Sequence, residues 1–526
     1  RRHTRYISVT GVQTCALPIS HSTSGRECVG ADDCQFGTKC FAVNAKAKAQ
    51  TADVVVTNHT LLAIEIVDSH PILPERDAII LDEAHEFMDR TTQAVTEELT
   101  ANRVLRAAAM ARKHMPGKAS DALSKAADKF AEAMGDYGDE YRANPEEQRR
   151  LDKVPAALEA PIRKVKEACE AIVSLINADS EIVDPDGLAE RARVKGAVNE
   201  IKVTATKMVR TGDGYVLWFE PTYSTLYLAP LVVSPVLRKN LFTKTPVIAT
   251  SATLTVGKSF DAIAQNLGLA IARSEEESDT EESWAIDPSN VQMVDVGSPF
   301  DFANQGMLYL PKHLPEPGRD GPSKEALVEL GELIEAAGGR TLALFSSWRG
   351  VEAADDHLRT VLAELPIPII TQRRGDSVGS LVERFSKVPE SVLLGTMSLW
   401  QGVDVPGSAC TLVAIDRIPF PRPDDPVMSA RAAEIDAGGG SGFMQVSLPR
   451  AALLLAQGTG RLIRSVDDRG VVAILDSRIV NKRYGAILLN SMPPLWRTGD
   501  GQVVKESLAR LNASYLETDS LETETK

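Results

Sequence analysis

Short apolar runs end in polar residues at several places along the chain, and this pattern predicts buried parallel strands. Residues 78–81 lead to Asp82 and Glu83, and residues 411–415 lead to Asp416. A continuous apolar run suits a strand that is covered on both faces. Similar runs occupy residues 53–59, 245–254, 341–345, 392–394 and 471–475. Because these strands alternate with helical segments, the pattern predicts doubly wound α/β domains.

Residues 89–211 differ from their surroundings because they are rich in alanine, lysine and glutamate. Their apolar positions repeat with a helical period, as at Leu123, Ala126 and Phe130. The α/β pattern resumes afterwards. We therefore predict an α-helical domain inserted into the first α/β domain, which would comprise residues 51–88 and 212–300.

The remaining boundaries follow from composition. Residues 315–322 contain prolines and read as a linker into a second α/β unit, which we place at residues 301–513. Residues 514–526 are acidic and polar, so we predict a disordered tail. Residues 1–20 lack periodicity, and part of them resembles the translated read-through of a sequencing adapter. We expect them to be non-native and reject a secretory signal, because polar residues interrupt the apolar core that a signal needs.

Length and composition fit a protein of several globular domains without a membrane span. The chain has 526 residues, 43% hydrophobic and 25% charged. The net charge of −14 argues weakly against nucleic acid, although it does not exclude a local basic groove. No apolar run approaches the roughly 20 residues needed to cross a bilayer. We expect a cytoplasmic monomer.

Three of the six cysteines, Cys28, Cys34 and Cys40, lie close together within residues 21–50. Such a cluster indicates a metal site in a reducing compartment. Zinc sites usually pair ligands two to four residues apart, whereas wider thiolate spacing is typical of an iron–sulfur cluster with four cysteine ligands. Iron–sulfur ligation, zinc and unligated thiols all stay open. Cys169 and Cys410 lie in apolar contexts and are expected to be inert core thiols.

Two further stretches indicate phosphate chemistry. Helix-like residues after Ser447 contain Gln457, Arg461 and Arg464, whose spacing predicts a common helix face suited to a phosphate. The alternative is an ordinary salt-bridged surface. Gly458 and Gly460 suggest that another backbone approaches closely. Residues 393–407 predict a strand that ends in a glycine- and hydroxyl-rich loop, in which Trp400 is either core or part of a site.

Four stretches together resemble the DinG/XPD-like branch of superfamily 2 ATP-dependent DNA helicases, closest to the bacterial DinG type. They occur in the family's order: residues 82–85 (Asp-Glu-Ala-His), 250–253 (Thr-Ser-Ala-Thr), 395–407 and 457–464. The cysteine cluster and the helical insertion also stand where the family has its iron–sulfur and arch domains. The resemblance implies two RecA-like parallel-sheet domains of the P-loop NTPase class, the first incomplete.

The resemblance implies roles residue by residue. Asp82 would hold Mg²⁺ through water, and Glu83 would be the catalytic base for ATP hydrolysis. His85 would couple the nucleotide to the second domain, and Gly402 and Asp404 would lie at the nucleotide cleft. The other implied residues are an arginine finger and its neighbours (Arg464, Arg461, Gln457), coupling residues (Ser251, Thr253), residues gripping single-stranded DNA (Ser346, Ser347, Thr396) and three ligands of a 4Fe-4S cluster (Cys28, Cys34, Cys40).

One departure from the family is serious, because the chain has no G-x-x-x-x-G-K-[ST] phosphate loop. Residues 256–259 (Val-Gly-Lys-Ser) imitate its end, but in the wrong order along the chain. We expect an N-terminally truncated helicase whose intact form uses ATP, Mg²⁺ and a 4Fe-4S cluster on single-stranded and forked DNA in repair or replication. The alternatives are an inert fragment that only binds nucleic acid, and an RNA helicase, which the cysteine cluster disfavours.

Overall fold

The structure is a computed structural model, and it describes residues 31, 34, 37–68, 71–143, 149–178, 185–210, 212, 214–269, 290–318, 321–400 and 407–524. The chain divides into two compact units. The first comprises Arg1–Arg76 and Arg90–Val232, and the second comprises Asp77–Asp89 and Val233–Lys526.

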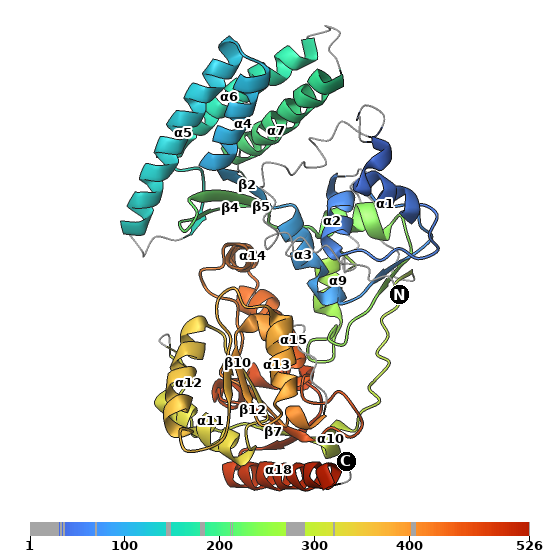
Figure 1. Cartoon of the computed structure of the whole chain (residues 1–526), viewed down its shortest axis with the longest axis vertical. Coiled ribbons are helices and arrows are strands. Elements are labelled where there is room, and N and C mark those ends of the chain that lie inside the picture. The colour runs from blue at the N-terminus through green and yellow to red at the C-terminus, as the bar shows by residue number, and fades with distance from the viewer. Residues whose placement is uncertain are drawn as a thin grey trace. The chain divides into compact units, whose positions relative to one another are not determined.

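Four long helices of the first unit pack side by side (Figure 1). They are α4 (Ala101–His114), α5 (Lys118–Ala143), α6 (Ala156–Ala178) and α7 (Pro185–Val209). Their apolar faces meet in one core that includes Phe130, Ile162 and Val198, each fully buried. Helices α1 (Phe41–Ala49) and α2 (His59–Asp68) belong to the same unit, and α3 (Phe87–Ala94) spans the junction.

The insertion also contains a sheet that the alanine-rich pattern does not predict. Strands β2 (Glu97–Thr100), β3 (Arg150–Leu151), β4 (Tyr215–Glu220) and β5 (Thr225–Pro230) form an antiparallel sheet in the order β2-β5-β4-β3. Strands β4 and β5 therefore pair with the insertion, although we assigned residues after 211 to the first α/β domain. The predicted boundary is too early because both strands find their hydrogen-bond partners inside the insertion.

In the second unit, β1 (Ile79–Leu81) pairs in parallel with β6 (Val247–Ala249). Helix α8 (Ser234–Leu237) precedes β6 in the chain, and α9 (Asp261–Leu267) follows it. The prediction of full burial is wrong for one face of this pair. Leu81 is 1% exposed, but Ile80 and its neighbour Ile248 are 70% and 57% exposed. Among the described residues this sheet has only two strands, and only one of its faces is covered.

A seven-stranded parallel sheet forms the centre of the second unit, in the order β13-β7-β12-β11-β8-β10-β9. Four strands lie where the apolar runs predict them: β8 (Thr341–Leu344), β10 (Val392–Gly395), β11 (Leu412–Ile415) and β12 (Gly470–Ile474). Three were not predicted: β7 (Gly306–Tyr309), β9 (Ile369–Thr371) and β13 (Trp496–Thr498). The parallel α/β fold class is confirmed.

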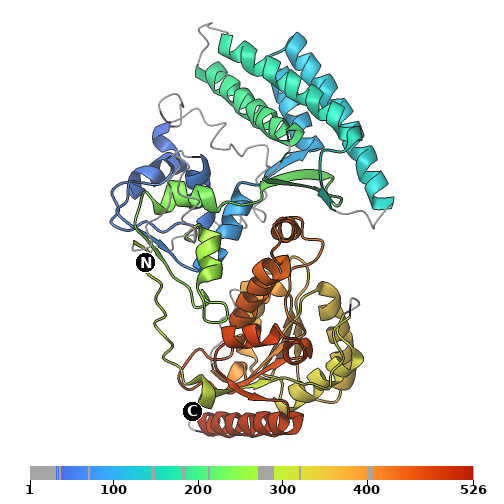
Figure 2. The same cartoon turned by 180° about the vertical axis from the view of Figure 1, so that it is seen from behind.

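Helices cover both faces of this sheet (Figures 1 and 2). Along each strand, alternate residues enter two separate cores. One core contains α11 (Lys324–Ala336), α12 (Trp348–Val361) and α18 (Gly501–Glu524), and the other contains α13 (Val378–Lys387), α15 (Leu448–Thr459) and α17 (Gly485–Ser491). The shorter α10 (Phe302–Gln305), α14 (Pro426–Ala437) and α16 (Arg478–Asn481) complete the unit.

Helix α18 contradicts the predicted disorder after residue 513, because it continues to Glu524. The helix is held from several directions. Val504 and Leu508 are buried in the core, Asn512 accepts a hydrogen bond from the buried Arg340, and the Tyr515 ring lies 5.5 Å from that guanidinium.

A second correction concerns residues 53–59, which we predicted as a buried strand. They form no strand, Val54 and Val56 are 80% and 84% exposed, and α2 begins at His59. An apolar run becomes a strand only where a neighbouring strand supplies hydrogen bonds, and the described residues supply none here. No described helix combines the length and the apolar character needed to cross a membrane.

Candidate nucleotide-hydrolysis site

The acidic box lies directly after β1, where the ligands of parallel sheets usually bind. The backbone of the neighbouring β6 fixes the turn, because Thr250 N–H donates to Leu81 O at 2.8 Å and Ala84 N–H donates to Thr250 O at 3.0 Å. Asp82 and Glu83 are solvent-exposed, whereas His85 is buried. Glu83 has φ 49° and is left-handed, a strained conformation for a residue with a side chain.

A chain of hydrogen bonds joins Glu83 to Gln457 through Ser251 and His85. Ser251 Oγ donates to Glu83 Oε2 at 2.9 Å and lies 2.9 Å from His85 Nδ1. On the other side of the imidazole, Gln457 Nε2 contacts His85 Nε2. Thr253 N–H also donates to Ser251 Oγ at 3.1 Å. The structure thus brings five predicted site residues from three segments of the chain together.

The single hydroxyl proton of Ser251 fixes the direction of this chain. Because that proton goes to Glu83, Ser251 must accept the hydrogen on His85 Nδ1. In this Nδ1–H tautomer, the Nε2 lone pair of His85 accepts from the Gln457 amide. The arrangement engages one oxygen of the Glu83 carboxylate, Oε2.

The predicted common helix face of Gln457, Arg461 and Arg464 is wrong, because α15 ends at Thr459. Arg461 turns back and donates from Nε and Nη2 to Trp400 O at 2.9 and 2.6 Å. Arg464 lies beyond the helix with an exposed side chain. A surface turn after residue 459 therefore positions the two arginines separately.

Gly458 is required by packing, although the close neighbour is not the backbone we expected. A Cβ at this position would lie 3.1 Å from Trp400 Cε3 and 3.3 Å from Ile415 Cδ1. Trp400 is fully buried, so of the two interpretations the core one is correct. Gly402 and Asp404, which we predicted at the cleft, lie outside the described residues.

The predicted DNA-gripping residues lie at the carboxyl ends of the adjacent strands β8 and β10. Ser346 N–H donates to Asp416 Oδ1 at 3.0 Å, and Ser347 Oγ caps α12 by accepting from Gly350 N–H at 3.1 Å. Thr396 donates from its backbone and its hydroxyl to Gln372 Oε1. Burial raises the pKa of the Asp416 carboxyl to about 6, and Arg417 opposes that shift.

The cysteine segment is described only in part, since Cys28 lies outside the described residues. Cys34 and Cys40 are half-buried free thiols joined through a turn at Gly37. Thiolates suit iron or zinc, but two thiols do not complete a site. The described residues hold no group of three potential metal ligands. Cys169 and Cys410 are buried, and burial raises the pKa of each thiol to about 12, which supports their assignment as inert.

Sequence reasoning missed two sets of residues in this unit. Asp89, four positions after His85, pairs with Arg450 at 2.7 Å and with Arg431 at 3.4 Å. Burial lowers the pKa of the Arg431 guanidinium, and Asp89 opposes that effect. The second set surrounds Asp468, which lies 4% exposed in the turn after Arg464. In both cases the sequence contained one indication, an acidic residue that lies close to a predicted motif and has no role in it.

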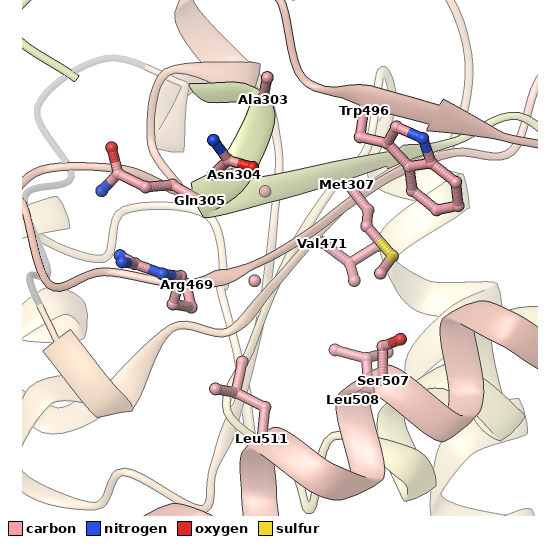
Figure 3. Close-up of a pocket in the computed structure, with 12 residues that line it drawn as sticks. Ala303, Asn304, Gln305, Met307, Arg469, Val471, Trp496, Ser507, Leu508 and Leu511 are labelled. Atoms are coloured by element: carbon pink, nitrogen blue, oxygen red, sulfur yellow. The ribbon is translucent and has the colours of Figure 1, made fainter. Parts of the chain in front are cut away.

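A cavity of about 410 Å³ lies at the amino ends of β7 and β12 and against α18, and none of the predicted site residues lines it (Figure 3). Residues 256–259, which imitate a phosphate loop, form a tight turn in which Val256 and Ser259 exchange backbone hydrogen bonds of 2.9 and 3.1 Å. That turn offers no cradle of amides, so it does not replace a phosphate loop.

Comparison with known proteins finds several that are similar to this chain. The helicase C-terminal domain family matches residues 330–495. The chain is 32% identical over 506 residues to the ATP-dependent DNA helicase YoaA of Escherichia coli K12, covering 92% of this chain and 73% of the relative. A solved structure described as S. tokodaii Xpd4 superposes with a TM-score of 0.48 at 14% identity, covering 83% of this chain and 80% of that one.

The chain is also similar to the ATP-dependent helicase DinG of Mycobacterium tuberculosis H37Rv. Identity is 42% over 503 residues, which cover 93% of this chain and 71% of the relative. The chain belongs to the DinG family of ATP-dependent helicases.

Proposed function

We propose that this chain is the larger part of an ATP-dependent DNA helicase that couples ATP hydrolysis to movement along single-stranded DNA and to duplex unwinding. The observation that carries the proposal is the chain of hydrogen bonds from Glu83 through Ser251 and His85 to Gln457. This chain of hydrogen bonds connects Glu83, the predicted catalytic base, with α15 of the seven-stranded domain. A conformational change at either end can therefore alter the geometry at the other end.

The chemistry assigns each group one task. Bound Mg²⁺ would neutralise charge on the phosphates of ATP, and Asp82 would hold it through water. Glu83 would accept hydrogen from the attacking water with the oxygen that Ser251 leaves available. Arg464, exposed beyond α15, would stabilise charge on the transferred phosphoryl group. Ser346, Ser347 and Thr396 mark the strand ends where we place the DNA backbone.

Substitution of Glu83 tests this assignment. In the full-length gene product, we expect Glu83→Gln to abolish DNA-stimulated ATP hydrolysis and forked-duplex unwinding while ATP binding persists. Glu434→Gln removes an exposed acid from α14 and serves as the matched control. Normal turnover by Glu83→Gln would refute Glu83 as the base.

We also propose that Cys28, Cys34 and Cys40 are ligands of a 4Fe-4S cluster whose fourth ligand precedes them in the full-length protein. Their spacing suits iron better than zinc. Purified full-length protein should show broad visible absorption with stoichiometric iron and acid-labile sulfide, and Cys34→Ser should remove both. Colourless protein with one zinc per chain would reverse the assignment.

A second candidate function applies to the 526-residue chain by itself. The chain lacks a G-x-x-x-x-G-K-[ST] loop, which favours a fragment that binds single-stranded DNA without hydrolysing ATP. Titration of the chain with a labelled single strand, with and without ATP, distinguishes the two functions, because a hydrolysing enzyme should change its DNA affinity when ATP is added.

A further inference from the structure

The turn after Arg464 is organised around one buried carboxylate. Asp468 Oδ2 accepts hydrogen bonds from Arg464 N–H at 2.7 Å and Ser465 N–H at 2.8 Å. Its Oδ1 accepts from Ser465 Oγ at 2.8 Å and from Gly407 N–H at 3.0 Å. Both oxygens are therefore used twice, which compensates for burying the charge.

Two side chains also donate hydrogen bonds to the backbone carbonyl groups of this turn. Gln305, 5% exposed at the end of α10, donates from Nε2 to Ser465 O and Val466 O at 3.0 and 3.1 Å and to Asp468 O at 3.3 Å. Arg469 donates from Nη1 to Val466 O and Asp468 O at 2.9 and 2.8 Å. In Figure 3 both side chains lie on the side of the cavity opposite Trp496.

Two segments meet at this carboxylate. Arg464 begins the turn, and Gly407 directly follows the segment that carries Gly402 and Asp404. Gly407 has φ 80°, a conformation that favours glycine, and its N–H points at Asp468. One side chain thus joins the backbone at Arg464 to the backbone at Gly407.

We propose that Asp468 is a positioning residue for ATP hydrolysis, which holds the backbone of Arg464 and that of Gly407 in a fixed relation before nucleotide binds. This rests on the function proposed for Arg464. A catalytic side chain is more effective when the backbone that carries it is already ordered, because no free energy is then needed to order that backbone during the reaction. Gln305 contributes from outside by holding the carbonyl groups of the same turn.

Asp468→Asn is a sharp test, because an amide keeps the size of the carboxylate and replaces one acceptor oxygen with a donor. If the amide nitrogen takes the Oδ2 place, it faces the Arg464 and Ser465 N–H groups; at the Oδ1 place, it faces Gly407 N–H. In either orientation the amide NH₂ group faces a backbone N–H group, so two donors meet and at least one hydrogen bond is lost. Asp467→Asn makes the same charge change at an exposed neighbour and is the matched control.

The first measurement is amide hydrogen exchange in the 526-residue chain. We expect Asp468→Asn to accelerate exchange at least tenfold at Gly407, Arg464 and Ser465, with no change in β11 or β8, whereas Asp467→Asn matches the parent. Unchanged exchange at these amides would overturn the proposal. If Asp468→Asn does not fold, Gln305→Leu replaces it, with the same readout at residues 464–468.

The second measurement is DNA-stimulated ATP hydrolysis by the full-length protein. We expect Asp468→Asn to lower kcat at least tenfold with KM for ATP changed less than threefold, and the double variant with Arg464→Ala to be no slower than Arg464→Ala alone. Additive losses, or a normal kcat for Asp468→Asn beside an impaired Arg464→Ala, would overturn the positioning role only. Normal turnover by Arg464→Ala would overturn the function proposed for Arg464, and the positioning role with it.

Discussion

Ser251 occupies the middle of the hydrogen-bond chain between Glu83 and His85, so its removal should disconnect both neighbours without touching either. In the full-length protein we expect Ser251→Ala to lower kcat for DNA-stimulated ATP hydrolysis by roughly tenfold or more, as losses of partners that orient a reacting group do. The KM for ATP should change little, because Ser251 contacts no predicted nucleotide ligand except through Glu83. Steady-state kinetics with saturating single-stranded DNA measures both constants.

The matched control is Ser386→Ala, since Ser386 donates only to Val382 O on the exposed side of α13. It should leave kcat and KM unchanged. A Ser251→Ala enzyme with normal kcat would mean that Glu83 needs no support from this hydroxyl and that the hydrogen-bond chain is structural.

Asp416 gives a pH prediction, because burial raises the pKa of its carboxyl from 3.8 to about 6. Between those values the folded state binds more protons than the unfolded state, so the free energy of unfolding should fall as pH rises from about 4 to 6. The loss is complete above about pH 7, one unit beyond the folded-state pKa, and it amounts to about 3 kcal/mol for this group. Chemical denaturation of the chain between pH 4 and 7.5 measures the slope.

Other carboxylates with lowered pKa values, including Asp355, act in the opposite direction, so the slope must be assigned by difference. Asp416→Asn cannot ionise and should remove this group's contribution, which makes the stability of the variant rise relative to the parent as pH increases. A constant difference between variant and parent across the range would show that Asp416 does not titrate there.

The resemblance assigned candidate site residues, but the sequence did not predict the contacts among them. His85, Ser251 and Gln457 were assigned by resemblance, and the structure joins them. His85 is 166 positions from Ser251 and 372 from Gln457. Local periodicity carries no information over such separations. Asp468 was missed for the same reason, because its importance lies in contacts with residues on both sides of a turn and with Gly407.

At the scale of elements, α15 depends on a glycine that lets Trp400 lie against the helix. We expect Gly458→Ala to lower the free energy of unfolding by about 1–3 kcal/mol, because its new methyl group would meet the indole at 3.1 Å in a filled core. Helix propensity alone predicts the opposite sign, since alanine normally favours a helix over glycine. Urea denaturation distinguishes the two.

Gly379→Ala is the comparison within the same unit. A methyl group there meets only Ser377 Oγ at 3.8 Å on the exposed side of α13, so it should stabilise the protein by up to about 1 kcal/mol. If Gly458→Ala proved equally stabilising, the close packing of Trp400 against α15 would be refuted.

Elements were predictable where one pattern decides them. Strands β8, β10, β11 and β12 are buried on both faces, so each appears as an apolar run followed by a polar residue. Strands β9 and β13 have only three residues each, and Trp496 at the sheet edge is 49% exposed, so they leave no such run. We placed the end of α15 too late, because Arg461 and Arg464 keep a helical spacing although they lie beyond the last helical residue.

At the scale of the whole molecule, the net charge of −14 gives no information on how the charged side chains are distributed. Arg431, Arg450 and Asp89 form one cluster, and Arg340 is fully buried with Glu390 as its partner. Several cations therefore serve the fold, and a count of charges says little about a DNA groove. The inserted helical unit was predictable from composition, whereas its antiparallel sheet was not, because β2 and its partner β5 are separated by more than a hundred residues.

The last prediction concerns what this chain can do without a phosphate loop. The side chains predicted to act on the γ-phosphate lie around residues 82–85 and 457–464, but a lysine-bearing loop normally holds the β- and γ-phosphates against them. We therefore expect negligible DNA-stimulated ATP hydrolysis by the 526-residue chain, measured as phosphate release with excess single-stranded DNA, beside robust hydrolysis by the full-length protein. Glu83→Gln in the same chain separates true turnover from a contaminating ATPase. Turnover that disappears in that variant would show that the acidic box and the α15 segment hydrolyse ATP without the loop.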